Sequence, residues 1–576
     1  MTAQVQSAYA ALRPADVVLS PDDLGGARAT RHSFSRSLVR RAVAGGWDIT
    51  LGRADLDEHG CGVVVFDVSA EGHRWSFVAF SQTIDESDRE DRVVASSWDV
   101  TAALVDGAVD DDDVARLRPE VIRQEQGRAD ERTLIWTRAN RSGRFFEYVV
   151  DRLADGAQPE PGVFGLSPYL LRSTAFYSNG KFGLADFERF EHGHPFAVPY
   201  RAHMLSAWLL RELGYELAER CAAARSETAV RLDGDWRRYF GLGNATGLGM
   251  VPYVVNHPEV LDAWIRLREL PLADVVARTV DRTGPDVPRV RTLLERAARY
   301  LAEQGDTEPT PYTSGAKLAA GLRPIQDLLT EYATYGTMGG AIEAQPWQHL
   351  HEAAAAAGSE VRGVVASVLT ELADDLDDVV EASLTCQERR DIDPKMRCGE
   401  LRGLIDADYD WLREFDFTDP TQTERFWYSS ANNEEPRRAY AGVDPGERVQ
   451  HAVDVARAVH ALSLDLAGAE AATSVGEFLL GHPWHRGAVA RVQSVRDLEY
   501  AELHANLLAG DFLPLHVQRL QLAVYGMDNY NPQSTDWLRV TLFSGAPRVA
   551  DLVDGTADDD WSFTPQPSEA DERTYA

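Results

Sequence analysis

The sequence predicts an α+β protein that is predominantly α-helical, in which an N-terminal α+β region with an antiparallel sheet precedes a large helical region. Three observations lead to this prediction. Before residue 152, short runs rich in β-branched and aromatic residues are separated by turn residues. After residue 162, apolar residues recur at helical spacing over most of the chain. Between them, ADGAQPEPG (154–162) has the Pro and Gly content of a linker.

The N-terminal α+β domain is predicted over 1–152. CGVVVFDVSAEGHRWSFVAFS (61–81) contains two β-rich runs around an Ala-Glu-Gly turn, which predicts a hairpin. SFSRSLVRRAVAGG (33–46) has apolar residues at helical spacing and ends in glycine, so a helix is predicted there. ERTLIWTRAN (131–140) is predicted as a further strand, and GRFFEYVVDRLA (143–154) as a helix.

The rest of the chain is predicted to be mainly helical. After a linker at 153–162, a helical domain over 163–420 is the candidate ligand-binding core, and a mainly helical region over 421–555 is expected to pack on it. The last segment, 556–576, is polar and contains proline, so it is predicted to be a disordered acidic tail. One amphipathic helix is predicted at 361–384, and four of its acids share a face that is expected to be solvated: Glu371, Asp374, Asp378 and Glu381.

Charge and composition exclude several classes of protein. The chain of 576 residues carries 91 acidic and 58 basic residues, a net charge of −33. Such a field repels phosphate backbones and anionic lipid surfaces, so neither nucleic acid nor membrane is an expected partner. The first residues have neither a basic segment nor an apolar core, and no run is long enough to span a membrane. We therefore expect a soluble cytoplasmic protein. If the protein is oligomeric, a homodimer is the expected form.

No catalytic signature identifies a reaction. The sequence contains no P-loop, no nucleophile elbow, no metalloprotease helix and no kinase set. The cysteines have no C-x-x-C spacing and are expected to be reduced thiols: Cys61, Cys221, Cys386 and Cys398. No cofactor can be assigned from these patterns.

Lysine usage is the sharpest compositional feature. Only three of the 58 basic residues are lysines, Lys181, Lys317 and Lys395. Where charge alone is needed this chain uses arginine, so a lysine is enriched for positions that need a compact or titratable amine. Lys181 lies in FYSNGKFG (176–183), a predicted turn that also contains Tyr177 and Asn179. Such a lysine can bind an anion or act in acid–base or covalent catalysis.

A glycine-rich segment supplies a second group of candidates. FGLGNATGLGMVPYVVNHP (240–258) is predicted to contain a loop that binds a phosphate or carboxylate through its backbone N–H groups. A dinucleotide fingerprint would need glycine at position 246, where this chain has threonine. The candidate ligand-binding residues are Gly243, Asn244, Thr246, Gly247 and Asn256, and His257 is a candidate acid or base.

Four segments combine aromatic residues with asparagine, and we refer to them as the Asn-aromatic segments: 176–183, 240–258, 425–438 and 525–537. The chain has nine asparagines, and seven of them lie in these segments. If the segments converge in space, they form one polar pocket with aromatic walls. The third and fourth segments add four candidate ligand-binding residues: Asn432, Asn433, Asn529 and Tyr530.

These candidates lead to a functional hypothesis with two alternatives. We expect an enzyme that acts on a small anionic metabolite, held by Lys181 and the glycine loop, with Tyr177, His203 or His257 transferring protons. The first alternative is a metal-dependent enzyme that uses His192 and His194. The second is a non-catalytic helical scaffold, which would expose a large apolar patch.

Overall fold

The computed structural model describes residues 11–85, 97–120, 132–165, 167–173, 190, 193–246, 258–306, 312–339, 342–373, 376–377, 379–380, 392–418, 452–496, 498–502, 514–532, 538–557 and 560–567. The chain forms two compact units, each assembled from segments distant in sequence. Unit 1 consists of 1–27, 247–278 and 373–521, and unit 2 of 28–246, 279–372 and 522–576. These discontinuous units differ from the continuous domains that the sequence predicted.

Unit 2 is built around a nine-stranded mixed sheet with the order β1-β2-β3-β4-β5-β6-β7-β11-β10. Its strands are β1 (Asp48–Leu56), β2 (Gly62–Ala70), β3 (His73–Ser81), β4 (Val100–Asp106), β5 (Thr133–Arg141), β6 (Tyr169–Ser173), β7 (Gly241–Thr246), β10 (Met527–Pro532) and β11 (Leu538–Leu542). α24 (Val549–Val553) follows β11, near one end of the strand order, and packs against β1 at the other end, which shows that the sheet is curled. The protein is therefore of the α+β class.

The predicted N-terminal elements are confirmed. The hairpin of β2 and β3 pairs Gly62 with Ser81 and Ala70 with His73. The predicted helix at 33–46 is α4 (Phe34–Ala44), the strand at 131–140 is β5, and the helix at 143–154 is α6 (Phe146–Ala154). The side chains of β2, β3 and β4 form a dense apolar core that includes Val65, Val78 and Ala103.

Two of the first five strands were not predicted. Side chains of β1 are largely exposed, so the strand lacks an apolar pattern and depends on its pairing with β2. β4 is a short apolar run that is buried along almost its whole length, and periodicity alone cannot distinguish such a run from a helix.

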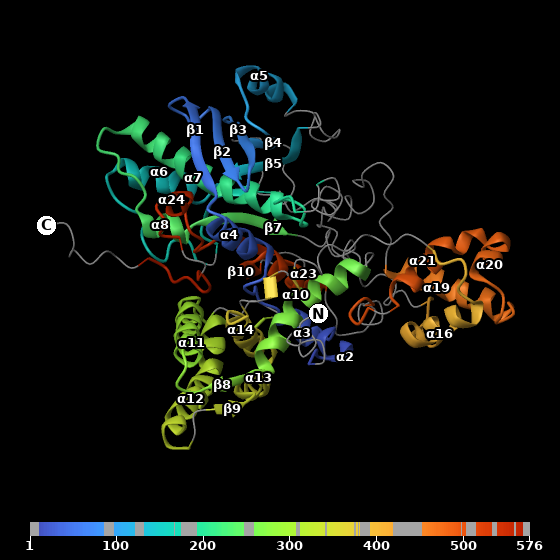
Figure 1. Ribbon diagram of the computed structural model, residues 1–576. Coiled ribbons are helices and arrows are strands. Elements are labelled where there is room, and N and C mark those ends of the chain that lie inside the picture. Colours follow the sequence, from blue (N-terminus) through green and yellow to red (C-terminus); the bar gives the residue numbers. More distant parts are fainter. Residues whose placement is uncertain are drawn as a thin grey trace. The chain divides into compact units, whose positions relative to one another are not determined.

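The sheet also contains four strands that follow residue 152 in the sequence, namely β6, β7, β10 and β11. The long helix α7 (Arg201–Arg225) packs on β5, β6 and β7, and the shorter helix α6 packs on α7 (Figure 1). α7 is buried along most of its 25 residues, which explains why its sequence is apolar on more than one side. A separate helical group in unit 2 contains α11 (Asp286–Glu303), α12 (Gly315–Gly339), α13 (Pro346–Ala357) and α14 (Ser359–Thr370), with the short pair β8 (Thr279–Asp281) and β9 (Ile342–Ala344).

Two sequence predictions in unit 2 are wrong. The helix predicted at 361–384 ends in α14 at Thr370, and Glu371, predicted to be solvated, is only 1% exposed. The segment after 556 was predicted to be a disordered tail, but Trp561 and Phe563 are buried. Aromatic side chains bury large apolar areas, and these two fix a segment that is otherwise polar. Residues 568–576 lie outside the described part of the chain.

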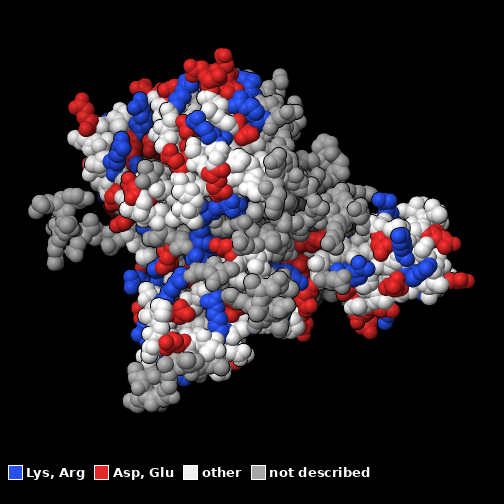
Figure 2. All heavy atoms as spheres, viewed as in Figure 1, with Lys and Arg blue, Asp and Glu red and all other residues white. Residues whose placement is uncertain are grey.

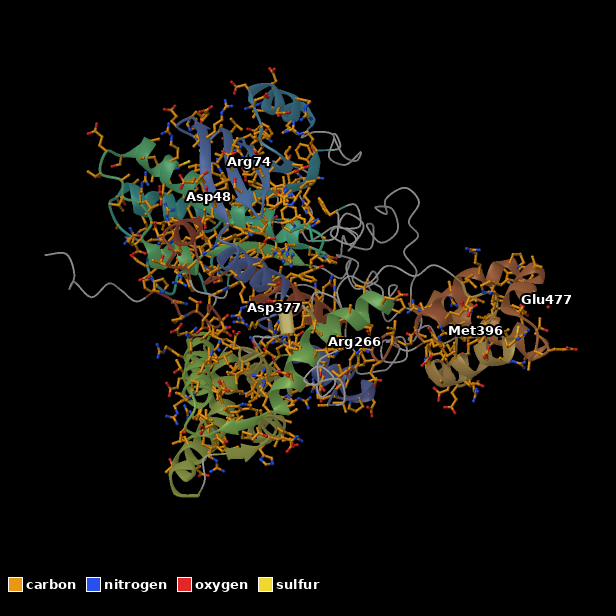
Figure 3. All side chains as sticks on the ribbon, viewed as in Figure 1. Asp48, Arg74, Arg266, Asp377, Met396 and Glu477 are labelled. Carbon is orange, nitrogen blue, oxygen red and sulfur yellow. The ribbon has the colours of Figure 1, made fainter. Side chains whose placement is uncertain are left out.

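The described part of unit 1 is mainly helical, with one isolated β-bridge between Arg397 and Ser474. Its helices are α2 (Ala15–Val18), α3 (Pro21–Gly25), α10 (Pro258–Val276), α16 (Cys398–Asp408), α19 (Ala452–Ala467), α20 (Val475–Gly481), α21 (Arg486–Ser494) and α23 (Pro514–Tyr525), the last of which continues into unit 2 at Leu522. Met396 precedes α16 and Glu477 lies in the first turn of α20 (Figure 3). Ser474 caps α20 by accepting the N–H of Glu477 at 3.2 Å.

A buried ion-pair network joins distant segments of unit 1. Glu269 on α10 is 1% exposed and accepts hydrogen bonds from Arg13 at 2.7 and 2.8 Å and from Arg268 at 2.9 Å. Burial by itself would raise the pKa of Glu269, but the two guanidinium groups outweigh it and lower the pKa to about 2. This carboxylate is therefore charged at neutral pH and holds the N-terminal segment on α10.

Surface charges of both signs are interspersed on the face shown in Figure 2. Acids gather over α5 (Asp111–Glu120), whose first turn contains Asp111, Asp112 and Asp113. Acidic side chains at this position stabilise the helix N-terminus. In the described part of the chain, no helix is both long and apolar enough to cross a membrane.

Candidate functional site

The parallel strands β6 and β7 define the candidate site. All other strand pairs described in this sheet are antiparallel. The chain passes from β6 through α7 and α8 (Gly234–Tyr239) to β7, so the unit is a strand–helix–strand crossover. Ligands of mixed and parallel sheets commonly bind beyond the carboxyl ends of such strands. The carboxyl ends are Ser173 in β6 and Thr246 in β7.

A hairpin meets the same edge of the sheet. Thr246 pairs with Leu538 at the start of β11, and Leu538 pairs with Pro532 at the end of β10. Pro532 and Leu538, the end of β10 and the start of β11, therefore lie at the edge where β6 and β7 end. We call this edge, bounded by Ser173, Thr246, Pro532 and Leu538, the carboxyl edge.

The first half of the predicted glycine loop forms a strand. Residues 241–246 form β7 in the interior of the sheet, between β6 and β11. A Cβ atom at Gly243 would lie 2.4 Å from the ring of Tyr169, and one at Gly241 would lie 2.4 Å from Cγ2 of Thr541. Both glycines are needed because side chains of the neighbouring strands occupy the space above them. The loop interpretation of Gly243 and Thr246 is therefore corrected.

Asn244 is the most informative side chain at this edge. It is 3% exposed and lies opposite Val540 of β11. The alternation of side chains along a strand places Asn244 on the same face of the sheet as Leu171. The helix α7 packs on that face, because a Cβ atom at Gly214 of α7 would lie 3.3 Å from Cγ of Leu171. Within the described residues, neither Oδ1 nor Nδ2 of Asn244 has a hydrogen-bond partner. A buried polar group in this state costs about 1–3 kcal/mol, so its retention calls for an explanation.

Most predicted site residues fall outside the described part of the chain: Tyr177, Asn179, Lys181, His192, Gly247, Asn256, His257, Asn432 and Asn433. Their positions in the sequence are nevertheless informative. The segment 176–183 comes directly after β6, and 247–258 comes directly after β7. Asn529 and Tyr530 lie on β10, where they pair with Thr541 and Val540. Three of the four Asn-aromatic segments are thus connected to strands that meet at the carboxyl edge.

His203, a predicted proton-transfer residue, lies in the first turn of α7 and is 1% exposed. Its ring centroid is 5.9 Å from that of Tyr200, and Tyr200 contacts Phe34 and Tyr525 in an aromatic cluster. Burial lowers the pKa of His203 to about 3. The imidazole is therefore neutral at physiological pH, and its basicity is far below that of an efficient general base.

His194, the described member of the predicted metal pair, also packs among rings. Its centroid is 4.3 Å from His73 and 4.3 Å from Phe190, and its Nδ1 accepts the N–H of Phe196 at 3.0 Å. Burial, followed by the neighbouring His73, lowers the pKa of His194 to about 4. Among the residues that the structure describes, no group of three or more His, Cys, Asp or Glu could hold a metal ion.

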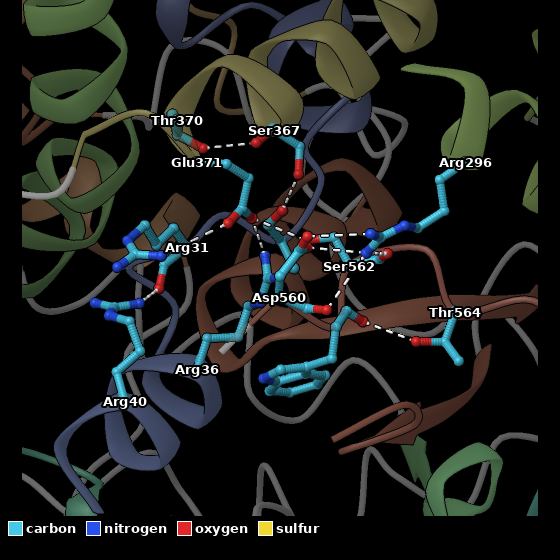
Figure 4. A network of polar contacts seen from close by, with 12 residues as sticks. Arg31, Arg36, Arg40, Arg296, Ser367, Thr370, Glu371, Asp560, Ser562 and Thr564 are labelled. Atoms are coloured by element: carbon cyan, nitrogen blue, oxygen red, sulfur yellow. Dashed lines mark hydrogen bonds and ion pairs between the residues drawn. The ribbon is translucent and has the colours of Figure 1, made fainter. Parts of the chain in front are cut away.

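A second polar centre lies at α4 (Figure 4). Arg36 is 2% exposed, and its guanidinium donates to Oε1 of Glu371 and to Oγ of Ser562. Ser562 Oγ in turn donates to Oε1 of Glu371 at 2.8 Å, and the Arg36 guanidinium lies over the Trp561 ring, 5.2 Å from its centroid. Arg31 approaches the other oxygen of Glu371 at 3.9 Å. The centre therefore joins α4, the end of α14 and the C-terminal segment.

Two further sets of hydrogen bonds hold the C-terminal segment near this centre. Arg296 on α11 forms two hydrogen bonds to Asp560, at 2.9 and 3.1 Å. Thr564 Oγ1 donates to the carbonyl of Trp561 at 3.0 Å. Sequence reasoning missed the centre because helical periodicity placed Glu371 on a solvated face. The aromatic residues of the C-terminal segment were the signal that it packs on the protein.

The N-terminus of α4 has the composition of an anion site but is covered by backbone. Ser33 and Ser35 are fully buried. A Cβ atom at Gly526 would lie 1.9 Å from Oγ of Ser35 and 2.9 Å from Oγ of Ser33. The turn at Gly526, which has a φ of +98°, therefore fills this space. We interpret the α4 centre as a structural connection, and the carboxyl edge remains the candidate functional site.

Comparison with known proteins adds no assignment to this geometry. The chain matched no protein-family model, no curated protein and no solved structure.

Proposed function

We propose that the protein is an enzyme that binds a small anionic metabolite, bearing a carboxylate or phosphate, at the carboxyl edge of β6 and β7. One observation carries the proposal: Asn244 presents a buried amide without a hydrogen-bond partner in the described part of the chain. A ligand oxygen or amine would complete these bonds. An oxyanion can accept from the amide N–H, and a hydroxyl or protonated acid can donate to the amide oxygen.

The connectivity of the sheet supports the same location. Lys181, Tyr177 and Asn179 belong to the segment that follows β6, and Asn256 and His257 belong to the segment that follows β7. We propose that Lys181 supplies the positive charge for the anion and that Tyr177 or His257 transfers protons. His203 is less suited to that role, because its pKa is near 3.

Ligand binding is tested by comparing the native and denatured masses of the purified protein, followed by thermal unfolding with a panel of carboxylates and phosphate esters. A ligand at about 100 times its Kd stabilises the folded state by about 2.7 kcal/mol. We expect a stabilising ligand for the wild type and no stabilisation of Asn244→Leu. The matched control is Thr541→Val, which removes a buried hydroxyl that also has no described partner but lies on the opposite face of the sheet. Equal stabilisation of all three proteins would refute the proposed site.

Catalysis is tested through the lysines. Lys181→Met should abolish turnover of the identified ligand while leaving the unfolding temperature unchanged. The control is Lys395→Met, because Lys395 is an exposed lysine of unit 1. Full activity of the Lys181 variant would exclude its proposed role.

One observation favours the scaffold alternative. In unit 1, Leu480 is 87% exposed at the end of α20 and Trp484 is 68% exposed just after it. Exposed large apolar side chains of this kind are typical of docking surfaces. Leu480→Ser with Trp484→Ser would abolish the cellular role of a scaffold but leave metabolite-induced stabilisation intact. Loss of that stabilisation would contradict a separate docking role.

A further inference from the structure

Two of the cysteines, distant in sequence, meet at one place in unit 2. Cys61 closes the turn between β1 and β2, and Cys221 lies near the end of α7. A Cβ atom at Gly60, the residue before Cys61, would lie 3.1 Å from Sγ of Cys221. Since a Cβ is about 1.5 Å from its Cα and consecutive Cα atoms are about 3.8 Å apart, the Cys221 sulfur lies within about 8.5 Å of the Cys61 Cα. The two cysteines are therefore neighbours in unit 2, and a disulfide between them requires their Cα atoms to lie within about 7 Å of each other.

The turn that carries Cys61 is held in place from several sides. Oδ1 of Asp57 accepts the N–H groups of His59 and Cys61 at 2.9 and 2.8 Å. Arg220, next to Cys221, donates to the carbonyl of Leu56 at 3.1 Å. The turn is thus fixed against α7, close to Cys221.

The two thiols have different surroundings. Cys61 is half-buried and its Sγ is 3.1 Å from Oγ1 of Thr83, whereas Cys221 is 5% exposed. An oxidant dissolved in water therefore reaches Cys61 first. Arg141 lies beside the pair, because its Nη2 would be 3.2 Å from a Cβ at Gly60. Burial raises the pKa of Cys221, and Arg141 counteracts this by favouring the thiolate.

We propose that Cys61 and Cys221 form a thiol pair that a peroxide converts into an intramolecular disulfide, with Cys61 as the oxidised residue and Cys221 as the resolving residue. In the first step the thiolate of Cys61 attacks hydrogen peroxide. The O–O bond breaks, a sulfenic acid forms and hydroxide leaves. In the second step the thiolate of Cys221 attacks that sulfur, the S–O bond breaks and a second hydroxide leaves. Together, two thiols and one peroxide give one disulfide and two water molecules.

The disulfide would join the β1–β2 turn to α7, the helix that covers β6 and β7. It would close a covalent loop between residues 61 and 221, which restricts the unfolded chain and should raise the unfolding temperature. Reduction would restore the initial value. The inference does not depend on the proposed metabolite site, because neither cysteine lies at the carboxyl edge.

The test uses the full-length reduced protein treated with hydrogen peroxide. We expect a loss of about 2 Da in the intact mass, a peptide that links Cys61 to Cys221, and a higher unfolding temperature that dithiothreitol reverses. Cys61→Ser and Cys221→Ser should each abolish the linked peptide. The control Cys398→Ser should retain it, because Cys398 is a buried thiol in unit 1.

Two results would overturn the proposal. The first is a gain of oxygen at Cys61 of the wild type, as sulfinic or sulfonic acid, without a link to Cys221. The second is an unchanged wild-type mass at peroxide concentrations that oxidise a free thiol peptide in the same tube. Circular dichroism of the reduced serine variants separates these results from misfolding, since both variants should retain the wild-type spectrum.

Discussion

Replacement of Asn244 by leucine separates a functional amide from a structural one. Leucine has nearly the shape of asparagine but no hydrogen-bonding group. If the amide of Asn244 is retained for a ligand, its removal relieves the free protein of an unpaired buried group. We therefore predict that Asn244→Leu stabilises the ligand-free protein and abolishes ligand binding. A residue that served the fold would show the opposite change in stability.

The size of the effect follows from the burial of this side chain. An unsatisfied buried polar group costs about 1–3 kcal/mol, so this is the expected gain in the free energy of unfolding. Unit 2 contains roughly 370 residues, and an unfolding entropy of about 2.1 cal/mol/K per residue gives about 0.8 kcal/mol/K. The unfolding temperature should therefore rise by about 1–4 °C.

The assay is differential scanning calorimetry of protein that has been refolded and dialysed to remove ligand. A matched control introduces the reverse change on the same face of the same strand. Leu242 is 1% exposed and two residues before Asn244, so Leu242→Asn should lower the stability by about 2–5 kcal/mol through a lost apolar contact and an unpaired amide. A fall in the unfolding temperature of Asn244→Leu would refute the reasoning, because it would mean that the amide is hydrogen-bonded in the free protein.

Three further predictions concern the surroundings of the site. The folded-state pKa of His203 is near 3, below its unfolded value of about 6.5, so the free energy of unfolding should fall by about 2 kcal/mol between pH 7 and pH 5. His203→Gln should remove this part of the pH dependence, measured by urea unfolding at each pH. A variant whose free energy of unfolding falls with pH as much as that of the wild type would contradict the prediction. Glu371→Gln should lower the free energy of unfolding by about 3–5 kcal/mol, because Arg36 would be left as an unpaired buried charge. An unchanged free energy of unfolding in urea would show that Glu371 does not balance a buried charge. Gly243→Ala should destabilise the protein by about 1–3 kcal/mol through its clash with Tyr169; the second change Tyr169→Leu should recover part of the loss, and additive losses would exclude the clash.

The parts of the fold that the sequence predicted correctly are those with local causes. The helix that became α4 has apolar residues on consecutive turns and a glycine after its last turn, and the β2–β3 hairpin has alternating runs around a turn. Each of these signals lies within about 20 residues of chain.

The parts that it missed depend on partners far along the chain. β6 and β7 are five and six residues long, and they become strands by pairing with each other and with β5 and β11. The glycines of β7 resemble a loop in sequence, because the ring of Tyr169 that makes Gly243 necessary is 74 positions away. Glu371 was misplaced for the same reason, since only the C-terminal segment with Ser562 covers it.

The candidate site shows how a local pattern and a topology combine. Asparagine and aromatic residues are concentrated in four segments, but composition alone cannot bring separate segments together. The parallel pairing of β6 with β7 places the carboxyl ends of these strands, Ser173 and Thr246, at the same edge of the sheet, and β10 and β11 pair into that edge from the other end of the chain. At this edge the one fully described asparagine, Asn244, is buried, and none of the residues that the structure describes forms a hydrogen bond with its amide. A buried polar group that costs folding free energy at this edge supports the proposal of a ligand that binds there.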